Sequence, residues 1–327
     1  MQTDFLTVST TSARRSAINA AVELLRKGEV VALPTETVYG LAADAVDPIA
    51  VAKIFEAKGR PRFDPLIVHL PSRDWLEKTA DVSAQDRELV FKLAEEFWPG
   101  PLTIVLPKRE AIPDIVTAGL DRVAIRISAH PAFAEIVQEF GKPLAAPSAN
   151  RFGRISPTTA KHVLDELKGF IPLIIDAGPT THGIESTIIT IHDGRIEVLR
   201  RGPITSEQLS EFAKVETATA AAKISAPGQL PAHYAPTTAL RLIDEVRSFQ
   251  SSERCALLAW NPLKKDDRFV AIRNLSEKQD LREAAANLFR DLRELDEMDV
   301  DLIVAERVPE QGLGAAILDR LTRASHS

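Results

Sequence analysis

The chain has 327 residues, of which 45% are apolar and 26% charged, values typical of a globular protein with one large domain or two ordinary ones. Its net charge of −6 argues against broad, non-specific nucleic-acid binding, although a local cationic pocket remains compatible with it. No apolar run approaches the roughly 18 residues of a membrane helix, and Cys255 is the single cysteine, so we expect a cytoplasmic protein without membrane association.

The first two-thirds of the chain alternates helical and strand patterns. Ser12 is the expected cap of a first helix, which Gly28 ends, and Asp47-Pro48 has the form of a cap and first residue of a second helix. Strands are expected at 29–33, 66–70, 102–106, 123–127, 144–146, 173–175, 186–192 and 195–199, and helices near 85–97, 130–140 and 158–168. This order predicts an α/β domain with a mixed sheet over residues 1–213.

Composition changes after residue 213. Residues 214–238 hold three prolines, a glycine and many small side chains without a sustained period, which predicts a linker. Strands are then expected at 239–243, 255–260, 269–272 and 302–305, with helices near 280–296 and 309–323. Alternating strands and helices predict a small doubly wound domain over residues 239–327.

Several familiar site motifs are absent. The sequence has no G-x-x-x-x-G-K-[ST] phosphate loop, no H-E-x-x-H or paired-cysteine zinc motif, and no G-x-S-x-G elbow. Three polar segments beside predicted strands remain, at residues 34–44, 58–70 and 146–158. Each alone is compatible with a solvated loop whose hydroxyls cap a helix. Together they bring cations and hydroxyl donors to strand ends, which predicts a nucleotide or phosphate site.

These segments carry a family resemblance. PTETVYGLAAD, KGRPRFDPLIVHL and PSANRFGRISPT, with the later GIESTI and LRRG, resemble the YrdC-like threonylcarbamoyl-AMP synthases. HYAP at 233–236 and the αβ tail resemble the long, two-domain form of that family, and the likeness runs from about residue 13 to 323. It implies a twisted open mixed sheet with a concave pocket, joined to a Rossmann-like C-terminal domain.

The resemblance also implies an activity. A nucleotidyltransferase of this family makes threonylcarbamoyl-AMP and pyrophosphate from L-threonine, bicarbonate and ATP. A downstream tRNA threonylcarbamoyl transferase complex then uses the product to modify an adenosine beside the anticodon. We expect Mg²⁺ to be carried by the ATP phosphates, and no metal site made of protein side chains. A weak contact with tRNA, or with double-stranded RNA generally, is expected as well.

Site residues follow from the same resemblance. Arg126 would pair with the threonine carboxylate, and Lys58 and Arg60 would face the triphosphate as the catalytic cations. The residues implied for L-threonine are Thr35, Thr37, His69, Arg126, Ala146 and Ser186. Those implied for ATP are Lys58, Arg60, Asp64, Arg122, Ser148, Asn150, Ser156, Arg200 and Tyr234.

Asp64 departs from the family pattern, which usually has asparagine before Pro-Leu. An ionised carboxylate repels a phosphate, so Asp64 is expected to pair with Arg60 or Arg62, or to help hold Mg²⁺. We also hypothesise that residues 214–238 act as a lid, with Tyr234 reaching over the nucleotide. Two other functions stay open: carbamoyl transfer from carbamoyl phosphate, and a non-catalytic RNA- or nucleotide-binding module that uses the same cationic pocket.

Overall fold

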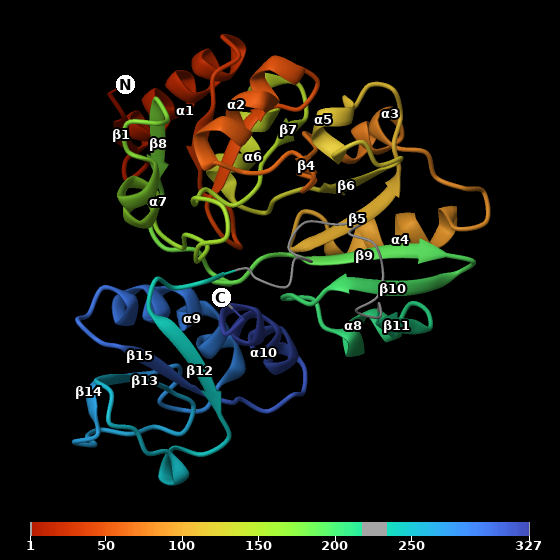
Figure 1. The fold of residues 1–327 in the computed structure, drawn as a ribbon. Helices are drawn as coiled ribbons and strands as arrows, with labels where there is room; N and C mark the ends of the chain where they lie inside the picture. Colours follow the sequence, from red (N-terminus) through yellow and green to blue (C-terminus); the bar gives the residue numbers. More distant parts are fainter. Residues whose placement is uncertain (1, 218–233, 327) are drawn as a thin grey trace.

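Two β-sheets organise the computed structural model, which describes residues 2–217 and 234–326 (Figure 1). The larger sheet has the strand order β1-β8-β2-β3-β7-β4-β6-β5-β9-β10-β11, and the smaller one β12-β15-β13-β14. The strands of the larger sheet are β1 (Asp4–Thr7), β2 (Val31–Leu33), β3 (Gly40–Asp44), β4 (Ile67–His69), β5 (Leu102–Pro107), β6 (Arg122–Arg126), β7 (Leu144–Ala145), β8 (Leu173–Asp176), β9 (Thr187–His192), β10 (Arg195–Arg200) and β11 (Val215–Thr217). Those of the smaller sheet are β12 (Ala239–Ile243), β13 (Cys255–Ala259), β14 (Phe269–Asn274) and β15 (Leu302–Glu306).

Helices cover both sheets. Those of the larger unit are α1 (Thr11–Arg26), α2 (Pro48–Lys58), α3 (Leu76–Thr79), α4 (Arg87–Phe97), α5 (Asp114–Thr117), α6 (Pro131–Phe140), α7 (Ala160–Leu167) and α8 (Ser206–Ser210). Those of the smaller unit are α9 (Leu281–Asp296) and α10 (Leu313–Ala324). Short 3-10 turns lie at η1 (Arg73–Trp75) and η2 (Val246–Ser248). No helix in these described ranges is long and apolar enough to cross a membrane.

The larger sheet is mixed, as predicted. Its β4–β6 and β5–β9 pairs are parallel, whereas β3–β7, β5–β6 and β9–β10 are antiparallel. In the parallel β4–β6 pair, His69 lies opposite Arg126, at the last residue of both strands. Because parallel strands end at the same sheet edge, this pairing places both polar side chains at one opening of the fold.

The capping residues of helix α2 determine where Lys58 and Arg60 are placed. The Asp47 side chain accepts a hydrogen bond from the Ile49 N–H, Pro48 follows, and Gly59 ends the helix in the left-handed conformation at φ 59°. This confirms the predicted start and end of the helix. Lys58 is therefore the last helical residue, and Arg60 lies just beyond a sharp turn.

Three local predictions were wrong. Thr10, not Ser12, caps α1, because its hydroxyl accepts from the Ala13 N–H. Strand β3 occupies a stretch predicted as loop, because its small apolar residues fit in the sheet between β2 and β7. Strand β11 pairs with β10 inside the range predicted as linker, and residues 218–233, which hold most of the hypothesised lid, lie outside the described residues.

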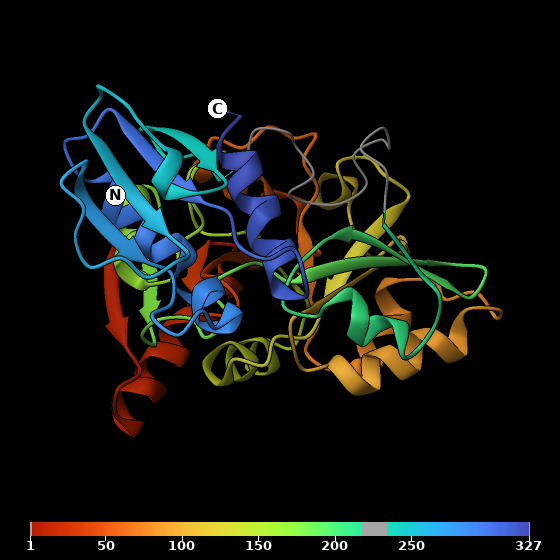
Figure 2. The ribbon, with the colours of Figure 1, turned by 90° about the horizontal axis from the view of Figure 1, so that it is seen from below.

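The smaller unit is a parallel sheet with α9 and α10 on the side that faces the larger unit (Figures 1 and 2). The parallel sheet with its helices confirms the Rossmann-like prediction. The doubly wound arrangement was wrong, because α9 and α10 pack together on one face of the sheet and neither lies on the other face. The apolar core of this unit extends across the boundary, since Val38, Ile155 and Ile184 of the larger unit pack in the same cluster as Leu288 and Phe289. The two units therefore share one hydrophobic core where they meet.

Candidate active site

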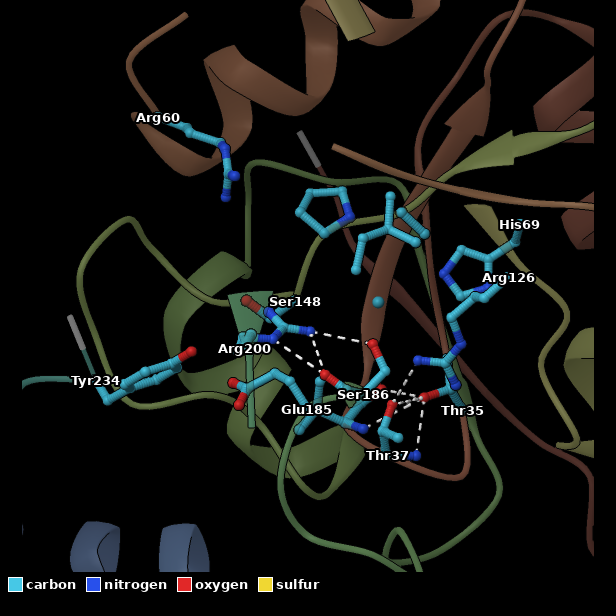
Figure 3. A pocket seen from close by; sticks show the side chains of 15 residues that line it. Thr35, Thr37, Arg60, His69, Arg126, Ser148, Glu185, Ser186, Arg200 and Tyr234 are labelled. Carbon is cyan, nitrogen blue, oxygen red and sulfur yellow. Dashed lines mark hydrogen bonds between the residues drawn. The ribbon is translucent and has the colours of Figure 1, made fainter. Parts of the chain in front are cut away.

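A pocket of about 530 Å³, open to solvent at its mouth, lies where these strand ends meet the smaller unit. That figure includes the part of the pocket that is open to solvent. Its lining residues come from the larger unit and, through Tyr234, from the segment that joins the two units (Figure 3): Thr35, Thr37, Val38, Gly40, Arg60, Ile67, His69, Arg126, Ala146, Pro147, Ser148, Glu185, Ser186, Arg200 and Tyr234.

One end of the pocket is built around Arg126. Its Nη1 donates to the Thr37 hydroxyl at 3.1 Å and its Nη2 to the Glu36 carboxylate, while the Thr35 and Thr37 hydroxyls lie 2.8 Å apart. The Nε of Arg126 is buried and has no hydrogen-bond partner among the described residues. The guanidinium is thus held in place by the 35–37 loop, and each Nη keeps a second N–H beyond these two bonds.

Burial and the Arg126 charge determine the ionisation states of Glu36 and His69 at this end of the pocket. Burial opposes ionisation of Glu36, but Arg126 and the Ser128 hydroxyl outweigh it and hold the pKa of Glu36 below its usual range. Burial and the nearby Arg126 charge both lower the pKa of His69 well below its usual value. At neutral pH the pocket therefore presents a neutral imidazole beside an ion-paired arginine.

Arg200 forms the middle of the pocket. Its Nη2 donates to the Ser186 carbonyl at 2.9 Å and to the Ser186 hydroxyl at 3.1 Å, and that hydroxyl lies 2.8 Å from the Thr103 hydroxyl. Gly202, two residues later, lets the chain pass close by, since a Cβ there would lie 2.4 Å from the Thr187 nitrogen. The end of β10 and the start of β9 thereby fix a buried cation beside a hydroxyl.

Arg60 marks the opposite end of the pocket from Arg126 (Figure 3). Its Nε donates to the Asp64 carbonyl at 3.2 Å, its Nη2 donates to the Pro65 carbonyl at 2.8 Å, and Nη2 also lies 2.8 Å from Asp64 Oδ2. The last contact joins opposite charges without hydrogen-bond geometry. Of the partners considered for Asp64, the structure therefore shows Arg60. Burial raises the pKa of Asp64, against the effect of Arg60.

Lys58 lies behind the pocket wall and does not line the pocket itself. Its Nζ donates to the Ser148 carbonyl at 2.5 Å and to the Asn150 carbonyl. Burial, and secondly the Arg60 charge, lower the pKa of Lys58 well below its usual value. In this state Lys58 ties the end of α2 to the 148–150 loop.

The structure gathers most of the predicted site residues but not all of them. Those that line the pocket are Thr35, Thr37, Arg60, His69, Arg126, Ala146, Ser148, Ser186, Arg200 and Tyr234. Asp64 lies beneath Arg60, the Asn150 amide donates to its own loop, and the Ser156 hydroxyl donates to Glu185. Arg122 lies away from the lining and donates to the Thr190 hydroxyl at 2.6 Å and to a β5 carbonyl.

Sequence reasoning missed two buried acids, Glu36 and Glu185. Glu36 pairs with Arg126, and Glu185 pairs with Arg320 of α10 at 2.9 Å. The available signal was their position, each a lone acid in a motif of hydroxyls and small residues, but their partners are distant in sequence. Among the described residues, no group of three or more His, Cys, Asp or Glu side chains could hold a metal ion. The acids near the pocket are instead paired with arginines.

Fold and pocket together define a class: a two-domain α/β protein whose site, rich in arginine and hydroxyl groups, suits a small anionic ligand such as a nucleotide. Comparisons with known proteins narrow it. Residues 23–202 match the Sua5/YciO/YrdC family model, described as "Telomere recombination". Residues 204–326 match the model described as "Threonylcarbamoyl-AMP synthase, C-terminal domain".

Relatives match along the whole chain. Threonylcarbamoyl-AMP synthase of Pyrococcus abyssi is 39% identical over 323 residues, covering 94% of each chain. The Bacillus subtilis protein of the same name is 41% identical over 325 residues, covering 94% of this chain and 92% of its own. The crystal structure of P. abyssi Sua5 complexed with L-threonine has a TM-score of 0.88 at 36% identity, covering 100% of this chain and 98% of its own. The chain belongs to the threonylcarbamoyl-AMP synthase family.

Proposed function

We propose that this protein is an L-threonylcarbamoyladenylate synthase, which makes threonylcarbamoyl-AMP and pyrophosphate from L-threonine, bicarbonate and ATP. The observation that carries the proposal is a single pocket with Arg126 at one end and Arg60 at the other, in a chain that matches a threonine-bound relative over its whole length. Such a pocket can hold an amino-acid carboxylate and a polyphosphate at once.

The Arg126 end suits L-threonine. A guanidinium has five N–H donors, so Arg126, oriented by Glu36 and Thr37, keeps further donors for a carboxylate, and this kind of charge-assisted pairing is strong in a buried site. Neutral His69 lies opposite Arg126 and adds no repulsion toward an ammonium group. Thr35, Ala146 and Ser186 complete this end as contacts of matching size and polarity.

The chemistry requires positioned charge. Bicarbonate takes up a proton and loses water to give CO₂, which adds to the neutral threonine amine. This step gives a carbamate and releases the proton again. A carbamate oxygen then attacks the α-phosphorus of ATP, the bond from that phosphorus to the β-phosphate bridging oxygen breaks, and pyrophosphate leaves. Arg60 and Arg200 are buried and held by backbone carbonyls, so they can stabilise phosphate charge without rearranging. No covalent enzyme intermediate is needed.

Binding of Mg²⁺ remains a proposal, and the residues present suit an ion held by the ATP phosphates and not by protein side chains. Glu36, Asp64 and Glu185 are each paired with an arginine, so the part of the site that the structure describes offers no free set of carboxylates. Mg²⁺ would therefore be held by phosphate oxygens and water, where it would neutralise triphosphate charge. We assign no protein ligand to it.

The remaining expectations extend the same proposal. The product would pass to a tRNA-modifying transferase, and the cytoplasmic location and the weak contact with tRNA or double-stranded RNA stay predictions. Nothing in the described site favours carbamoyl transfer or a non-catalytic RNA-binding role. Lys58, Asp64, Arg122, Asn150 and Ser156 also stay predicted ATP contacts, although none lines the pocket in this state.

The test is direct. Purified protein is mixed with ATP, Mg²⁺, labelled bicarbonate and L-threonine, quenched, and searched for labelled threonylcarbamoyl-AMP. We expect a product peak that requires threonine and disappears in Arg60→Ala and Arg126→Ala, while Arg87→Ala, which removes an exposed arginine of α4, keeps it. ATP binding without any threonine-dependent product would refute the proposal.

A further inference from the structure

The smaller unit packs behind the loops that line the pocket and supports them. Three apolar residues adjoin pocket loops: Val38 lines the pocket after Thr37, Ile155 precedes Ser156, and Ile184 precedes Glu185. All three are buried in the core of the smaller unit. The loops that shape the pocket therefore rest on the smaller unit, and their positions depend on it.

The loop that carries Glu185 is held from two sides. Gly183 has φ +70°, and a Cβ there would lie 2.4 Å from the Ala285 carbonyl oxygen of α9. On the other side, a Cβ at Gly202 would lie 2.6 Å from the Glu185 carbonyl oxygen. Only glycine allows such close backbone approach, so the segment is clamped between α9 and the end of β10.

Arg320 of α10 makes the polar contacts of this junction. It is fully buried, and its Nε donates to Glu185 Oε2 at 2.9 Å. Its Nη2 donates to the Arg201 carbonyl at 2.9 Å and its Nη1 to Asp319 at 2.7 Å. Its guanidinium carbon lies 5.0 Å from the centre of the Tyr234 ring. One side chain of the smaller unit thus contacts two residues that line the pocket.

Tyr234 is held just as firmly. Its backbone has φ 65°, its ring is buried, and it stacks on Phe289 of α9 with ring centres 5.5 Å apart. Figure 3 shows Tyr234 and Glu185 on the side of Arg200 and Ser148, away from Thr37 and Arg126. In the proposed function this is the nucleotide side of the pocket.

Glu185 is a buried carboxylate that lines a pocket proposed to bind an anion, so its negative charge has to be compensated. An anion would be repelled by Glu185 unless its charge were compensated. Burial opposes the charge of Glu185, but Arg320, Arg200 and the Ser156 hydroxyl outweigh it and lower its pKa. Arg320 therefore lets the acid remain ionised, hydrogen-bonded to Ser156, and balanced in charge.

We propose that Arg320 is a positioning residue for nucleotide binding: from the smaller domain, it holds Glu185 and Tyr234 at the pocket and compensates the Glu185 charge. The identity of the nucleotide rests on the proposed function. Arg320 does not line the pocket, so its effect would act through Glu185 and Tyr234. The smaller domain thus contributes to the affinity for ATP through a single buried arginine.

The test measures binding of a non-hydrolysable ATP analogue with Mg²⁺ to the full chain by calorimetry. We expect Arg320→Met to raise Kd by roughly ten- to a hundredfold, and Arg320→Lys to raise it less. Kd of Arg320→Met should also improve as pH falls, because the uncompensated Glu185 then takes up a proton. Adding Glu185→Gln to Arg320→Met should recover most of the lost affinity at neutral pH.

Arg293→Met is the matched control. Arg293 of α9 also bridges the two units, pairing with Glu166 and donating to the Ile155 carbonyl, but it contacts no side chain of the pocket. It should lower thermal stability and leave Kd within about twofold, well below the loss expected from misplacing a site group. If Arg320→Met does not fold, Arg320→Lys and Glu185→Gln are compared in its place.

Two outcomes overturn the inference: an unchanged Kd in folded Arg320 variants, or equal losses in the Arg320 and Arg293 variants. Product formation by the wild-type protein is assayed separately. A protein that binds the analogue through Arg320 but makes no threonylcarbamoyl-AMP would refute the proposed function and leave this inference standing.

Discussion

Replacing Asp64 by asparagine tests how the pocket treats its own negative charges. The side chain is buried against Arg60, and asparagine has almost the same shape. Arg60 should keep its place, because its Nε and Nη2 also donate to the Asp64 and Pro65 carbonyls, which the substitution leaves intact. The substitution therefore removes one negative charge and leaves the position of the Arg60 side chain nearly unchanged.

The size of the effect follows from the ion-pair distance. Asp64 lies 2.8 Å from one side of the Arg60 guanidinium, so a phosphate oxygen on its other side would be roughly 6 Å from the carboxylate. At an effective dielectric constant of about 20, two unit charges at that separation repel by about 3 kcal/mol. Allowing for solvent at the pocket mouth, we expect about 1–2 kcal/mol, or roughly five- to thirtyfold tighter ATP binding. Folding stability should fall by up to about 3 kcal/mol, because a buried cation loses its partner.

Calorimetric titration with the Mg²⁺ complex of a non-hydrolysable ATP analogue measures the first effect, and urea denaturation the second. Asp44→Asn is the matched control, since Asp44 is a buried carboxylate paired with Lys142 at 2.9 Å outside the pocket. It should lose stability without any gain in affinity. Unchanged or weaker nucleotide binding by Asp64→Asn would refute the view that Asp64 opposes phosphate at Arg60.

Three further predictions follow from other parts of the structure. Arg126→Lys should raise KM for L-threonine by roughly ten- to a hundredfold while nucleotide Kd changes little, because lysine cannot present paired donors to a carboxylate; an unchanged KM would contradict this. Gly178→Ala should lower the free energy of unfolding by about 1 kcal/mol, because Gly178 has a positive φ of 80°. Gly183→Ala should lower it by several kcal/mol more, because the new Cβ would lie 2.4 Å from the Ala285 carbonyl oxygen. Equal losses of stability in thermal denaturation would show that the segment is not clamped against α9. Burial, and secondly Arg293, lower the pKa of His162 to about 4, so the unfolded chain takes up a proton that the folded chain refuses between pH 6.5 and pH 4. Stability should be complete above pH 6.5 and fall by roughly 2 kcal/mol across that window after allowance for solvent, and urea denaturation of His162→Gln should show a correspondingly weaker pH dependence.

Local chemistry was readable from the sequence where it acts over a few residues. Asp47, Pro48 and Gly59 specify the start and end of α2 through one cap, one fixed φ and one left-handed turn, and the structure confirms all three. At α1 four consecutive hydroxyl residues, Ser9 to Ser12, compete as caps, and the sequence pattern does not show which one reaches the free N–H groups. Strand β3 was missed because its small apolar residues become a strand only between two partners from elsewhere in the chain.

In the site, too, local features were predictable from the sequence and long-range contacts were not. The motifs supplied most pocket residues, since each lies in a loop directly attached to a predicted strand. The ion pairs that compensate the buried acids could not be predicted from the sequence. Glu36 pairs with Arg126, and Glu185 with Arg320, and the residues of each pair are far apart in sequence and meet only in the folded chain. Only the Arg60–Asp64 pair, four residues apart, was close enough in sequence to be considered.

The core shared by the two units has a consequence for folding. Val38, Ile155 and Ile184 would be exposed to water if the smaller unit opened or were removed, and they adjoin the loops that line the pocket. Exposure of that apolar surface is unfavourable, so the two units should unfold as one cooperative block. In this chain, loss of the smaller unit should therefore expose part of the core of the larger unit and displace the loops that line the pocket.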